Sequence, residues 1–584
     1  MKAKIRPRWR SLLLGALLSF VACSLLLAAL QPQRQVSMLM PDESWQAQPH
    51  PWEFSTPYVE RTARIVIRHG LASPGTWRII PDDHLLAFSI NGQHFPLEQV
   101  APEQLRDYRR GFVANLAPIL KPGDNVLEFT VSNSEGPGGI TLQPEPGPTS
   151  IALLCLSLLP LAWGLARFFR VTRRQCLVLS LALLPLVTYW VYTPWTERSH
   201  DVAGLGGHLD YIRWIAENLS LPEAKDGWTF YHPPLYYILG APLWKWAAWL
   251  GIDSGVAMQA YSLVLWLIFL AASAGTIRLA LRSSPWLGML ATLALVLWPS
   301  GIMHAIRIGN DVGFYALAAL AFYCGLRWWQ NHRRSALVAA AICAALLIWT
   351  KSNGLVVIAS LGLLLAWRCI RPHRSFRTAL TDLGIFCALA GGAMLLNLSD
   401  NIYLYLQGES SNWLISNVVS LDERLRVPVA LQYFIPLDLP AFLATAWLDP
   451  WNDASGRQNF WNYLLRSALS GEFSFGGRLQ TGLSYVWGCL LILLLGRILL
   501  VAKWRHLLDG DWLQRNALWL VSVPLWLVGL LVLRIQTPFA CSNDFRYILP
   551  VLLPFVILSV GSGAFARYLL AGICVSSWVF FLWF

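Results

Sequence analysis

The chain has 584 residues, of which 55% are hydrophobic and only 13% are charged, and its formal net charge at pH 7 is +12. This composition excludes an ordinary soluble globular protein and is typical of a chain that crosses a bilayer many times. The positive charge does not indicate a nucleic-acid partner, because the basic residues form short clusters at the ends of apolar segments and not one basic face or tail.

The chain begins with the basic segment 1–10, which is followed by an apolar segment at 11–30. About 20 apolar residues are enough to cross a bilayer as a helix. A cleaved signal peptide is the alternative, but this apolar segment is longer than that of a typical signal peptide, and no clear small-residue cleavage site follows it. We therefore expect residues 1–40 to form an uncleaved membrane anchor with its N-terminus in the cytoplasm.

Residues 41–147 differ in composition from the rest of the chain and contain no apolar run long enough to span a membrane. Apolar and polar residues alternate with a period of two in three segments, which predicts β-strands at 64–70, 84–95 and 125–133. Asn91-Gly92 predicts a tight turn. We expect an extracytoplasmic all-β domain. Its features resemble the galactose-binding-like jelly-roll modules attached to many carbohydrate enzymes, and a spacer that binds no sugar is the alternative.

Long apolar segments predict that residues 148–584 form a polytopic α-helical membrane domain. The expected spans are 149–167, 175–193, 257–280, 285–303, 311–328, 335–351, 353–369, 378–397, 480–502, 515–534, 546–563 and 565–583. With the anchor they make about 13 transmembrane helices. Segment 234–250 is apolar but contains Pro242 and Lys245, so we expect it to lie in the membrane interface.

The basic residues distinguish the two sides of this domain. They cluster in alternate connections, at 167–174, 278–282, 327–334, 368–377 and 497–505. Arginine and lysine are enriched on the cytoplasmic side, so these connections are expected to be cytoplasmic. The long connections 194–256 and 398–479 then lie on the outer side.

Ionisable and other polar residues without a role in setting orientation gather on the outer side. They come from four connections and include Glu197, Asp201, Asp210, His232, His304, Arg307, Asn310, Asp311, Lys351, Asp544, Arg546 and Tyr547. Ionisable groups beside a bilayer are costly and commonly mark a functional site. Arg307, Lys351 and Arg546 are suited to a phosphate, because arginine binds phosphate oxygens in a bidentate manner and lysine supplies a point charge.

Each of these side chains also has a structural explanation. Lys351 stands at the end of a span and can extend to the interface. Arg546 can pair with Asp544, and Asp311 can cap the helix that starts there. Asp210 can lie on the polar face of an amphipathic helix. The sequence leaves both kinds of explanation open.

Five elements, in this order, resemble the GT-C superfamily of integral membrane glycosyltransferases. The similarity is to its bacterial protein-mannosyltransferase-like and aminoarabinose-transferase-like branch, which is glycosyltransferase family 39-like. The elements are His200-Asp201, the Tyr-x-Pro-Pro-Leu segment 231–235, the Arg-x-x-Asn-Asp segment 307–311, Thr350-Lys351 and Arg546-Tyr547. The resemblance covers about residues 175–563, and its short motifs are specific as an ordered set, although each is weak alone.

The resemblance implies a GT-C fold and an inverting glycosyltransferase. The enzyme would move a sugar from a polyprenyl-phosphate donor to an acceptor hydroxyl at the outer face of the bacterial cytoplasmic (inner) membrane. Asp201 would be the catalytic base that takes the acceptor proton. Arg307, Lys351 and Arg546 would bind the donor and stabilise the leaving lipid phosphate.

The same resemblance implies that His232, Asp311, Asp210 and Tyr236 orient the substrates. Members of the superfamily often involve a divalent metal ion and some do not, so metal dependence stays open. No nucleotide cofactor is expected, because the chain has no phosphate-binding loop and no dinucleotide-binding glycine motif. The expected partners are the polyprenyl-phosphate sugar, a protein, lipid or glycan acceptor, and the bilayer, with no nucleic acid.

Two departures from the family pattern leave the sugar and the acceptor open. Val202 follows the first acid, where eukaryotic-type protein mannosyltransferases have Glu, and His232 stands where the aminoarabinose branch usually has Lys.

Two other functions also remain. Arg424, Arg426, Arg457 and Arg466 in the loop 398–479 keep open a lipid-diphosphate-dependent oligosaccharide transferase or ligase. A membrane transporter would place its ionisable residues near the bilayer midplane and often show internal repeats, unlike this sequence.

Overall fold

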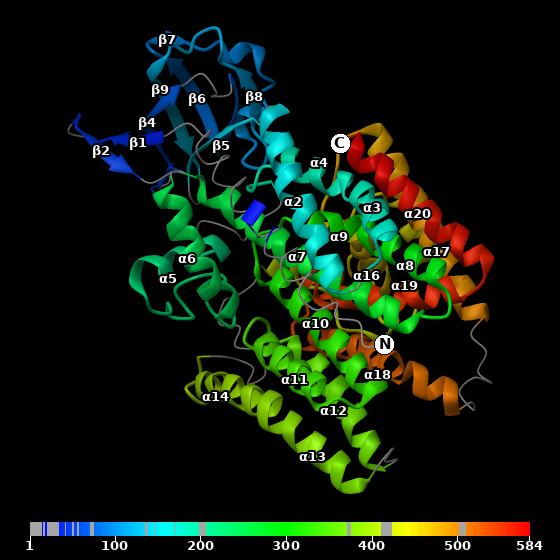
Figure 1. Ribbon diagram of the computed structural model, residues 1–584. Coiled ribbons are helices and arrows are strands. Elements are labelled where there is room, and N and C mark those ends of the chain that lie inside the picture. The colour runs from blue at the N-terminus through cyan, green and yellow to red at the C-terminus, as the bar shows by residue number, and fades with distance from the viewer. Residues whose placement is uncertain are drawn as a thin grey trace. The chain divides into compact units, whose positions relative to one another are not determined.

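The computed structural model describes residues 15, 18 and 19 and, from 34 to 583, all residues except 41–42, 49–51, 55, 57, 70–74, 135–137, 146–147, 170, 198–205, 251, 371–374, 410–422 and 502–509. The chain divides into two compact units. The β-rich unit comprises Met1–Leu161, Trp190–Phe230 and Tyr237–Tyr261, and the helical unit comprises Ala162–Tyr189, Tyr231–Tyr236 and Ser262–Phe584. Figure 1 labels the elements of each unit.

Two antiparallel sheets form the β domain. The first has the order β2-β1-β4-β9-β6-β7 and consists of β1 (Arg34–Leu39), β2 (Trp45–Gln48), β4 (Val59–His69), β6 (His84–Ile90), β7 (Gln93–His94) and β9 (Gly123–Asn133). The second has the order β3-β10-β5-β8 and consists of β3 (Trp52–Phe54), β5 (Thr76–Asp82), β8 (Phe112–Asn115) and β10 (Gly138–Pro144).

Both sheets bury side chains in one shared core, which makes the domain a β-sandwich. Along β9 every second residue is buried, as the period-two pattern predicts. Its Phe129 stacks on Phe88 of β6 with ring centroids 4.5 Å apart, and Trp52 and Trp77 of the second sheet belong to the same core. The three predicted strand segments are thereby confirmed.

The edges of this domain give one agreement and one difference. Asn91 and Gly92 have φ values of 52° and 78° and form the tight turn between β6 and β7, as predicted. The first strand, however, begins at Arg34, inside the segment 1–40 assigned to the anchor. Val36 is buried in the sandwich core, so these residues are held by the sheet.

Helices make up most of the remaining chain. The β-rich unit holds α5 (His208–Asn218) and most of α6 (Leu235–Trp249), and α2 (Pro148–Phe168) and α7 (Ser254–Ala280) continue from it into the helical unit. The helical unit contains α3 (Arg173–Ala182), α4 (Leu184–Tyr192), α8 (Pro285–Val296), α9 (Pro299–His304), α10 (Asn310–Asn331), α11 (Arg334–Ile348), α12 (Gly354–Ile370), α13 (Phe376–Phe386), α14 (Gly392–Leu406), α15 (Leu439–Ala444), α16 (Phe460–Ser470), α17 (Arg478–Val501), α18 (Gly510–Gln536), α19 (Leu552–Gly561) and α20 (Ala564–Leu582).

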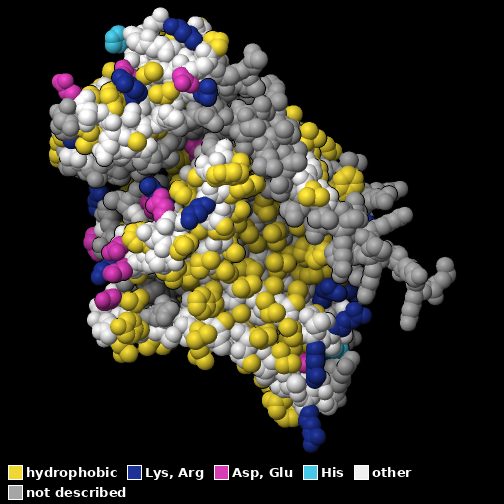
Figure 2. Space-filling model, turned by 60° about the vertical axis from the view of Figure 1, so that its left-hand side comes forward, with side chains coloured by type: hydrophobic (Ala, Val, Ile, Leu, Met, Phe, Trp, Pro, Cys, Tyr) yellow, Lys and Arg dark blue, Asp and Glu magenta, His cyan; other side chains and the backbone are white. Residues whose placement is uncertain are grey.

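Within the described residues, six helical segments are long and apolar enough to cross a membrane: Ser254–Ala280, Phe376–Leu406, Arg478–Val501, Asn516–Gln536, Ala540–Gly561 and Ala564–Leu582. Large apolar side chains on these segments are exposed, such as Leu395 (65%) and Leu500 (85%). Figure 2 shows hydrophobic side chains spread over one face of the helical unit. Such a surface suits contact with lipid, and the chain is a multi-pass membrane protein.

Several expected spans are interrupted, so the predicted pattern of about 13 continuous helices is not reproduced. The segment 285–303 divides into α8 and α9 before Pro299, and 175–193 divides into α3 and α4 before Pro185. A short 3-10 helix at Phe545–Val551, which contains Pro550, opens the segment predicted at 546–563. Proline lacks the backbone N–H that a continuous helix requires. The predicted anchor at 11–30 lies almost wholly outside the described residues.

Asp82, at the end of β5, gives the β domain a pH-dependent stability. Burial and the neighbouring Asp83 raise the pKa of Asp82 to about 7. Between about pH 4 and pH 7, Asp82 is therefore protonated in the folded domain but ionised in the unfolded chain, where its pKa has the ordinary low value. The free energy of unfolding falls as the pH rises through this range, because the folded state binds the additional proton.

We expect Asp82→Asn to slow hydrogen exchange in β5 and β10 at pH 8 and to match the wild type near pH 4. Asp124→Asn, at an exposed position of β9, is the control, and an equal effect of both variants would contradict this assignment.

Candidate active site

Four segments of the helical unit meet beside the helix interruptions. They are Tyr231–Tyr236, the connection between α9 and α10, the turn between α11 and α12, and the 3-10 helix Phe545–Val551. Hydrogen bonds tie each segment to the next. The amide of Leu235 donates to the carbonyl of Trp349 (3.0 Å), and the Asn310 side chain donates to the carbonyl of Thr350 (3.0 Å).

The segment from the late connection is held in the same way. The hydroxyl of Tyr315, on α10, donates to the carbonyl of Arg546 (2.8 Å), and the Asn353 side chain donates to the carbonyl of Tyr547 (3.0 Å). Interrupted helices leave backbone carbonyls without helical partners, and such groups are costly when buried. The polar side chains satisfy these groups and fix the four segments against one another.

Asp311 and Lys351 form a buried ion pair at this junction. Asp311 lies in the first turn of α10, where a negative charge is favourable, but the N-cap residue of this helix is Gly309. The Asp311 carboxylate is therefore not the helix cap, and it pairs with Lys351. The Lys351 ammonium lies 4.9 Å from the centroid of the Tyr547 ring. Lys351 is 6% exposed and therefore points into the protein, not out to the interface.

Arg546, from the 3-10 helix Phe545–Val551, belongs to the same cluster. Its Nε lies 3.7 Å from the Asp544 carboxylate, and its backbone amide donates to the same carboxylate at 2.9 Å. Asp311 also interacts electrostatically with Arg546 and with the buried Arg307. The structure thus brings Arg307, Lys351 and Arg546 together, as their predicted common role requires. Each guanidinium has five N–H donors, so an arginine can hold a carboxylate and a phosphate together.

His304 is a buried histidine at the edge of this cluster, with 1% of its surface exposed. Among the described residues, neither of its ring nitrogens has a hydrogen-bond partner. Burial, and next the positive charge of Arg307, lower the pKa of His304 to about 3. The imidazole is therefore neutral at physiological pH and can donate or accept one hydrogen bond with a bound ligand.

Glu472 is a further acid in the cluster that sequence reasoning missed. It interacts electrostatically with Asp544 and Arg546, and it accepts a hydrogen bond from the Tyr463 hydroxyl of α16. Glu472 follows α16 in the long loop 398–479. The strong amphipathic pattern of residues 460–470 could have placed a helix there.

The remaining predicted site residues have different surroundings. Asp201 lies outside the described residues. Asp210 belongs to the β-rich unit, where its carboxylate accepts the Gly207 amide at 2.8 Å and caps α5. His232 lies beside Tyr231, with ring centroids 4.2 Å apart. The buried Tyr236 hydroxyl accepts the amide of Gly309 at 3.2 Å and so holds the segment that carries Arg307 and Asp311.

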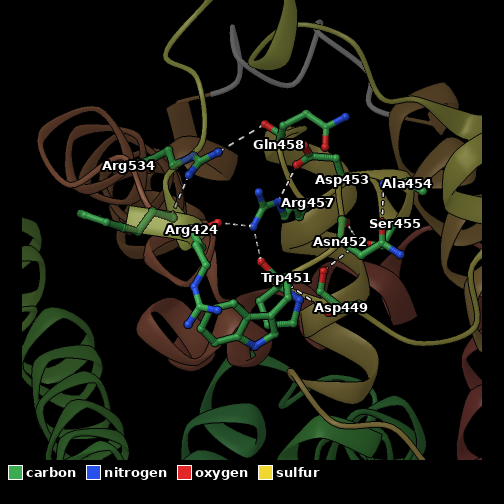
Figure 3. A network of polar contacts seen from close by, with 12 residues as sticks. Arg424, Asp449, Trp451, Asn452, Asp453, Ala454, Ser455, Arg457, Gln458 and Arg534 are labelled. Carbon is green, nitrogen blue, oxygen red and sulfur yellow. Dashed lines mark hydrogen bonds and ion pairs between the residues drawn. The ribbon is translucent and has the colours of Figure 1, made fainter. Parts of the chain in front are cut away.

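Of the four arginines considered in the loop 398–479, Arg457 and Arg466 hold backbone carbonyls, Arg426 pairs with Glu423, and Arg424 lies over the Trp451 ring. Figure 3 shows Arg457 donating to the carbonyls of Arg424 (2.9 Å) and Pro450 (2.7 Å) beside its ion pair with Asp453. In the same view Arg534 of α18 donates to the carbonyl of Gln458 at 3.3 Å. Arg466 donates to the carbonyl of Phe442. These contacts stabilise the loop, and they spread the arginines over several backbone segments.

No group of three or more His, Cys, Asp or Glu side chains in the described part of the chain is arranged to hold a metal ion. Asp311 and Asp544 are each engaged by a cation. The carboxylates of Asp311 and Asp544 are thus already engaged by cations of the protein, which does not favour their use as metal ligands.

No protein-family model matches the chain, and no curated protein matches it. Among solved structures, the S. cerevisiae protein O-mannosyltransferase Pmt1-Pmt2 complex bound to the sugar donor matches with 18% identity and a TM-score of 0.30. That match covers 42% of this chain and 36% of the other. The arabinosyltransferase EmbB from Mycobacterium smegmatis matches with 13% identity and a TM-score of 0.29, and covers 98% of this chain and 64% of the other.

The chain thus spans 36% and 64% of the lengths of these two solved chains. At such TM-scores neither likeness carries an argument about fold or activity.

The buried pair of Asp311 and Lys351 predicts a large stability effect. Asp311→Asn leaves the Lys351 ammonium buried without its counter-charge, which typically costs about 3–5 kcal/mol of unfolding free energy. Denaturation in mixed detergent micelles would measure this loss. Glu217→Gln, in the half-exposed pair of Glu217 with Arg213, is the control and should cost less than about 1 kcal/mol. Equal losses in the two variants would show that the ion pair of Asp311 does not stabilise the helical unit.

Proposed function

We propose that the chain is an inverting glycosyltransferase that uses a polyprenyl-phosphate sugar as donor and a hydroxyl group as acceptor. The observation that carries the proposal is the meeting of Arg307, Lys351 and Arg546 at one polar junction of an otherwise apolar helical unit. Three fixed cations from three separate connections suit a ligand with several anionic oxygens.

The surroundings of the junction favour a lipid-linked donor. The two helices on either side of Lys351, Arg334–Ile348 and Gly354–Ile370, are apolar, so a prenyl chain can lie along them while its phosphate reaches the cations. A sugar linked to a lipid phosphate already carries its leaving group. A nucleotide is therefore unnecessary, which agrees with the lack of nucleotide-binding motifs in the sequence.

The proposed reaction is a single displacement at the anomeric carbon. The acceptor oxygen forms the new glycosidic bond as the bond from the anomeric carbon to the phosphate oxygen breaks, and attack from the opposite face inverts the configuration. The acceptor proton passes to the carboxylate of Asp201. Arg307, Lys351 and Arg546 stabilise the negative charge that develops on the departing lipid phosphate.

Other residues would position these groups. Asp311 holds Lys351 through their ion pair, and Tyr236 holds the segment of Arg307 through the amide of Gly309. His232 would orient the donor or the acceptor. Asp210 caps α5 directly after the segment that contains Asp201, so its proposed contribution is to fix the end of that segment.

The proposed location is the bacterial inner membrane, with the active site facing the periplasm. The clustering of basic residues in the opposite connections supports this orientation. The β-sandwich precedes the helical unit in the chain and would lie on the same outer side. A protein, lipid or glycan acceptor fits this location, and no step proposed here passes through a metal ion.

A monophosphate donor is favoured over a diphosphate donor by the contacts of the long loop. A diphosphate donor carries more negative charge and would need additional cations near the cluster. The arginines of the loop 398–479 are the candidates for supplying them. Arg457 and Arg466 instead donate to backbone carbonyls of the loop and its neighbours.

Transfer of radiolabelled sugar from purified polyprenyl-phosphate donors to an envelope extract tests the proposal. We expect Asp201→Asn to lower the initial rate by about 10²–10⁴-fold, because the substitution keeps the size of the side chain and removes the base. Donor binding, measured separately, should be unchanged. Asp226→Asn, at an exposed aspartate of the same outer connection, is the matched control and should retain the wild-type rate.

Two results would overturn parts of this assignment. Equal transfer by the wild type and Asp201→Asn would remove Asp201 from the reaction. Transfer from diphosphate-linked donors alone would replace the monophosphate donor by the ligase alternative.

A further inference from the structure

The helical unit contains a second basic site, far along the helices from the candidate active site. A cavity of about 540 Å³ lies between the connection that precedes α3, the connection between α7 and α8, and the connection between α10 and α11. Four arginines line it: Arg278, Arg282, Arg327 and Arg333. The described residues of the lining include no carboxylate.

This cavity and the candidate active site lie at opposite ends of α10. Asp311 is in the first turn of that helix, and Arg327 is near its end. At a rise of 1.5 Å per residue, the two positions are about 24 Å apart along the helix axis. The cavity is therefore separate from the proposed site of sugar transfer and lies toward the predicted cytoplasmic face.

The basic cavity continues into an apolar groove. A second, smaller cavity shares Leu179, Ala274 and Thr292 with the first. Its further lining is almost wholly apolar and includes Trp163 and Leu270. The second cavity, of about 40 Å³, thus gives the cationic end a small apolar extension.

Aromatic contacts hold the cationic end in place. Phe169 and Tyr323 pack edge to face with ring centroids 5.0 Å apart, and the Arg327 guanidinium lies 5.5 Å from the Tyr323 ring. A Cβ on Gly275 would lie 3.0 Å from the Phe169 Cβ and 3.0 Å from the Tyr323 ring, so this wall is closely packed. Arg327 is thereby positioned at the cavity by packing and is not a freely extended surface side chain.

We propose that this cavity binds the phosphate head group of an anionic membrane lipid and that a hydrocarbon chain of the lipid lies in the adjoining groove. Guanidinium groups bind phosphate oxygens strongly, and anionic lipids are enriched where basic residues meet the membrane. The positive-inside tendency accounts for arginines at this face, but not for a cavity between them or for its apolar extension. A free phosphate would occupy only the cationic end.

Photochemical cross-linking tests the proposal on the purified full-length protein. The protein would be placed in phosphatidylcholine nanodiscs that contain phosphatidic acid with a diazirine on its acyl chain. We expect labelled peptides from α2 and α7, around Trp163 and Leu270. Unlabelled phosphatidic acid should compete, whereas inorganic phosphate should not.

Three variants make the test specific. Arg282→Gln/Arg327→Gln should lower labelling more than about tenfold, because the phosphate loses two charged hydrogen-bond donors. Gly288→Leu should lower it similarly, since the nearest atom to a Cβ there is 3.9 Å away and the side chain would enter the cavity. Arg377→Gln, at an exposed arginine of α13 outside the lining, should keep wild-type labelling. Thermal denaturation would confirm that all three variants fold.

Several outcomes would overturn the assignment. Equal labelling in all variants would exclude the cavity as the binding site. Equal labelling by a diazirine diacylglycerol, which lacks the phosphate, would exclude head-group recognition. Displacement of the lipid by inorganic phosphate would identify a site for the free anion and not for a lipid.

Discussion

Backbone polar groups buried within a membrane protein need partners inside the protein, and this constraint organises the helical unit. Where helices end or prolines interrupt them, carbonyl groups lack helical partners. Tyr315 and Asn353 satisfy the carbonyls of Arg546 and Tyr547 at the late connection, and Asn310 satisfies that of Thr350. The same hydrogen bonds fix the segments that carry the ionisable cluster. The interruptions therefore create the polar junction and also give it a defined geometry.

Charge inside this junction is balanced by specific pairs. Lys351 is held by Asp311, and Arg546 by Asp544, while Arg307 contributes a third cation. A buried ion pair is weak as a source of stability when compared with well-packed apolar residues, so its presence here favours a functional explanation.

The cluster and the arginine-lined cavity lie at opposite ends of α10 and differ in kind. The first mixes cations with carboxylates, whereas the described lining of the second has cations without carboxylates, which suits retention of an anionic lipid.

Much of this architecture could be predicted from the sequence, and the exceptions have physical causes. Alternation along β9 and the Asn91-Gly92 turn define the β domain because strand period and turn chemistry are local properties. Arg307, Lys351 and Arg546 could be grouped because hydrophobicity and basic clusters assign each connection to one side of the membrane. Glu472 was missed because its place beside Asp544 depends on how the long loop folds back, which no local pattern encodes. The divisions at Pro185 and Pro299 were also missed, since a hydrophobic window does not register a single proline. The role of Asp201 remains a proposal based on the family resemblance.

The central claim is that the junction of Arg307, Lys351 and Arg546 binds the phosphate of a lipid-linked sugar. An electron cryo-microscopy structure of the full-length protein with a polyprenyl-monophosphate sugar would test it most directly. We expect density for the phosphate within hydrogen-bonding distance of these three side chains, with the prenyl chain lying along the apolar helices. A donor bound at another place, with the junction unoccupied in the same map, would contradict the claim.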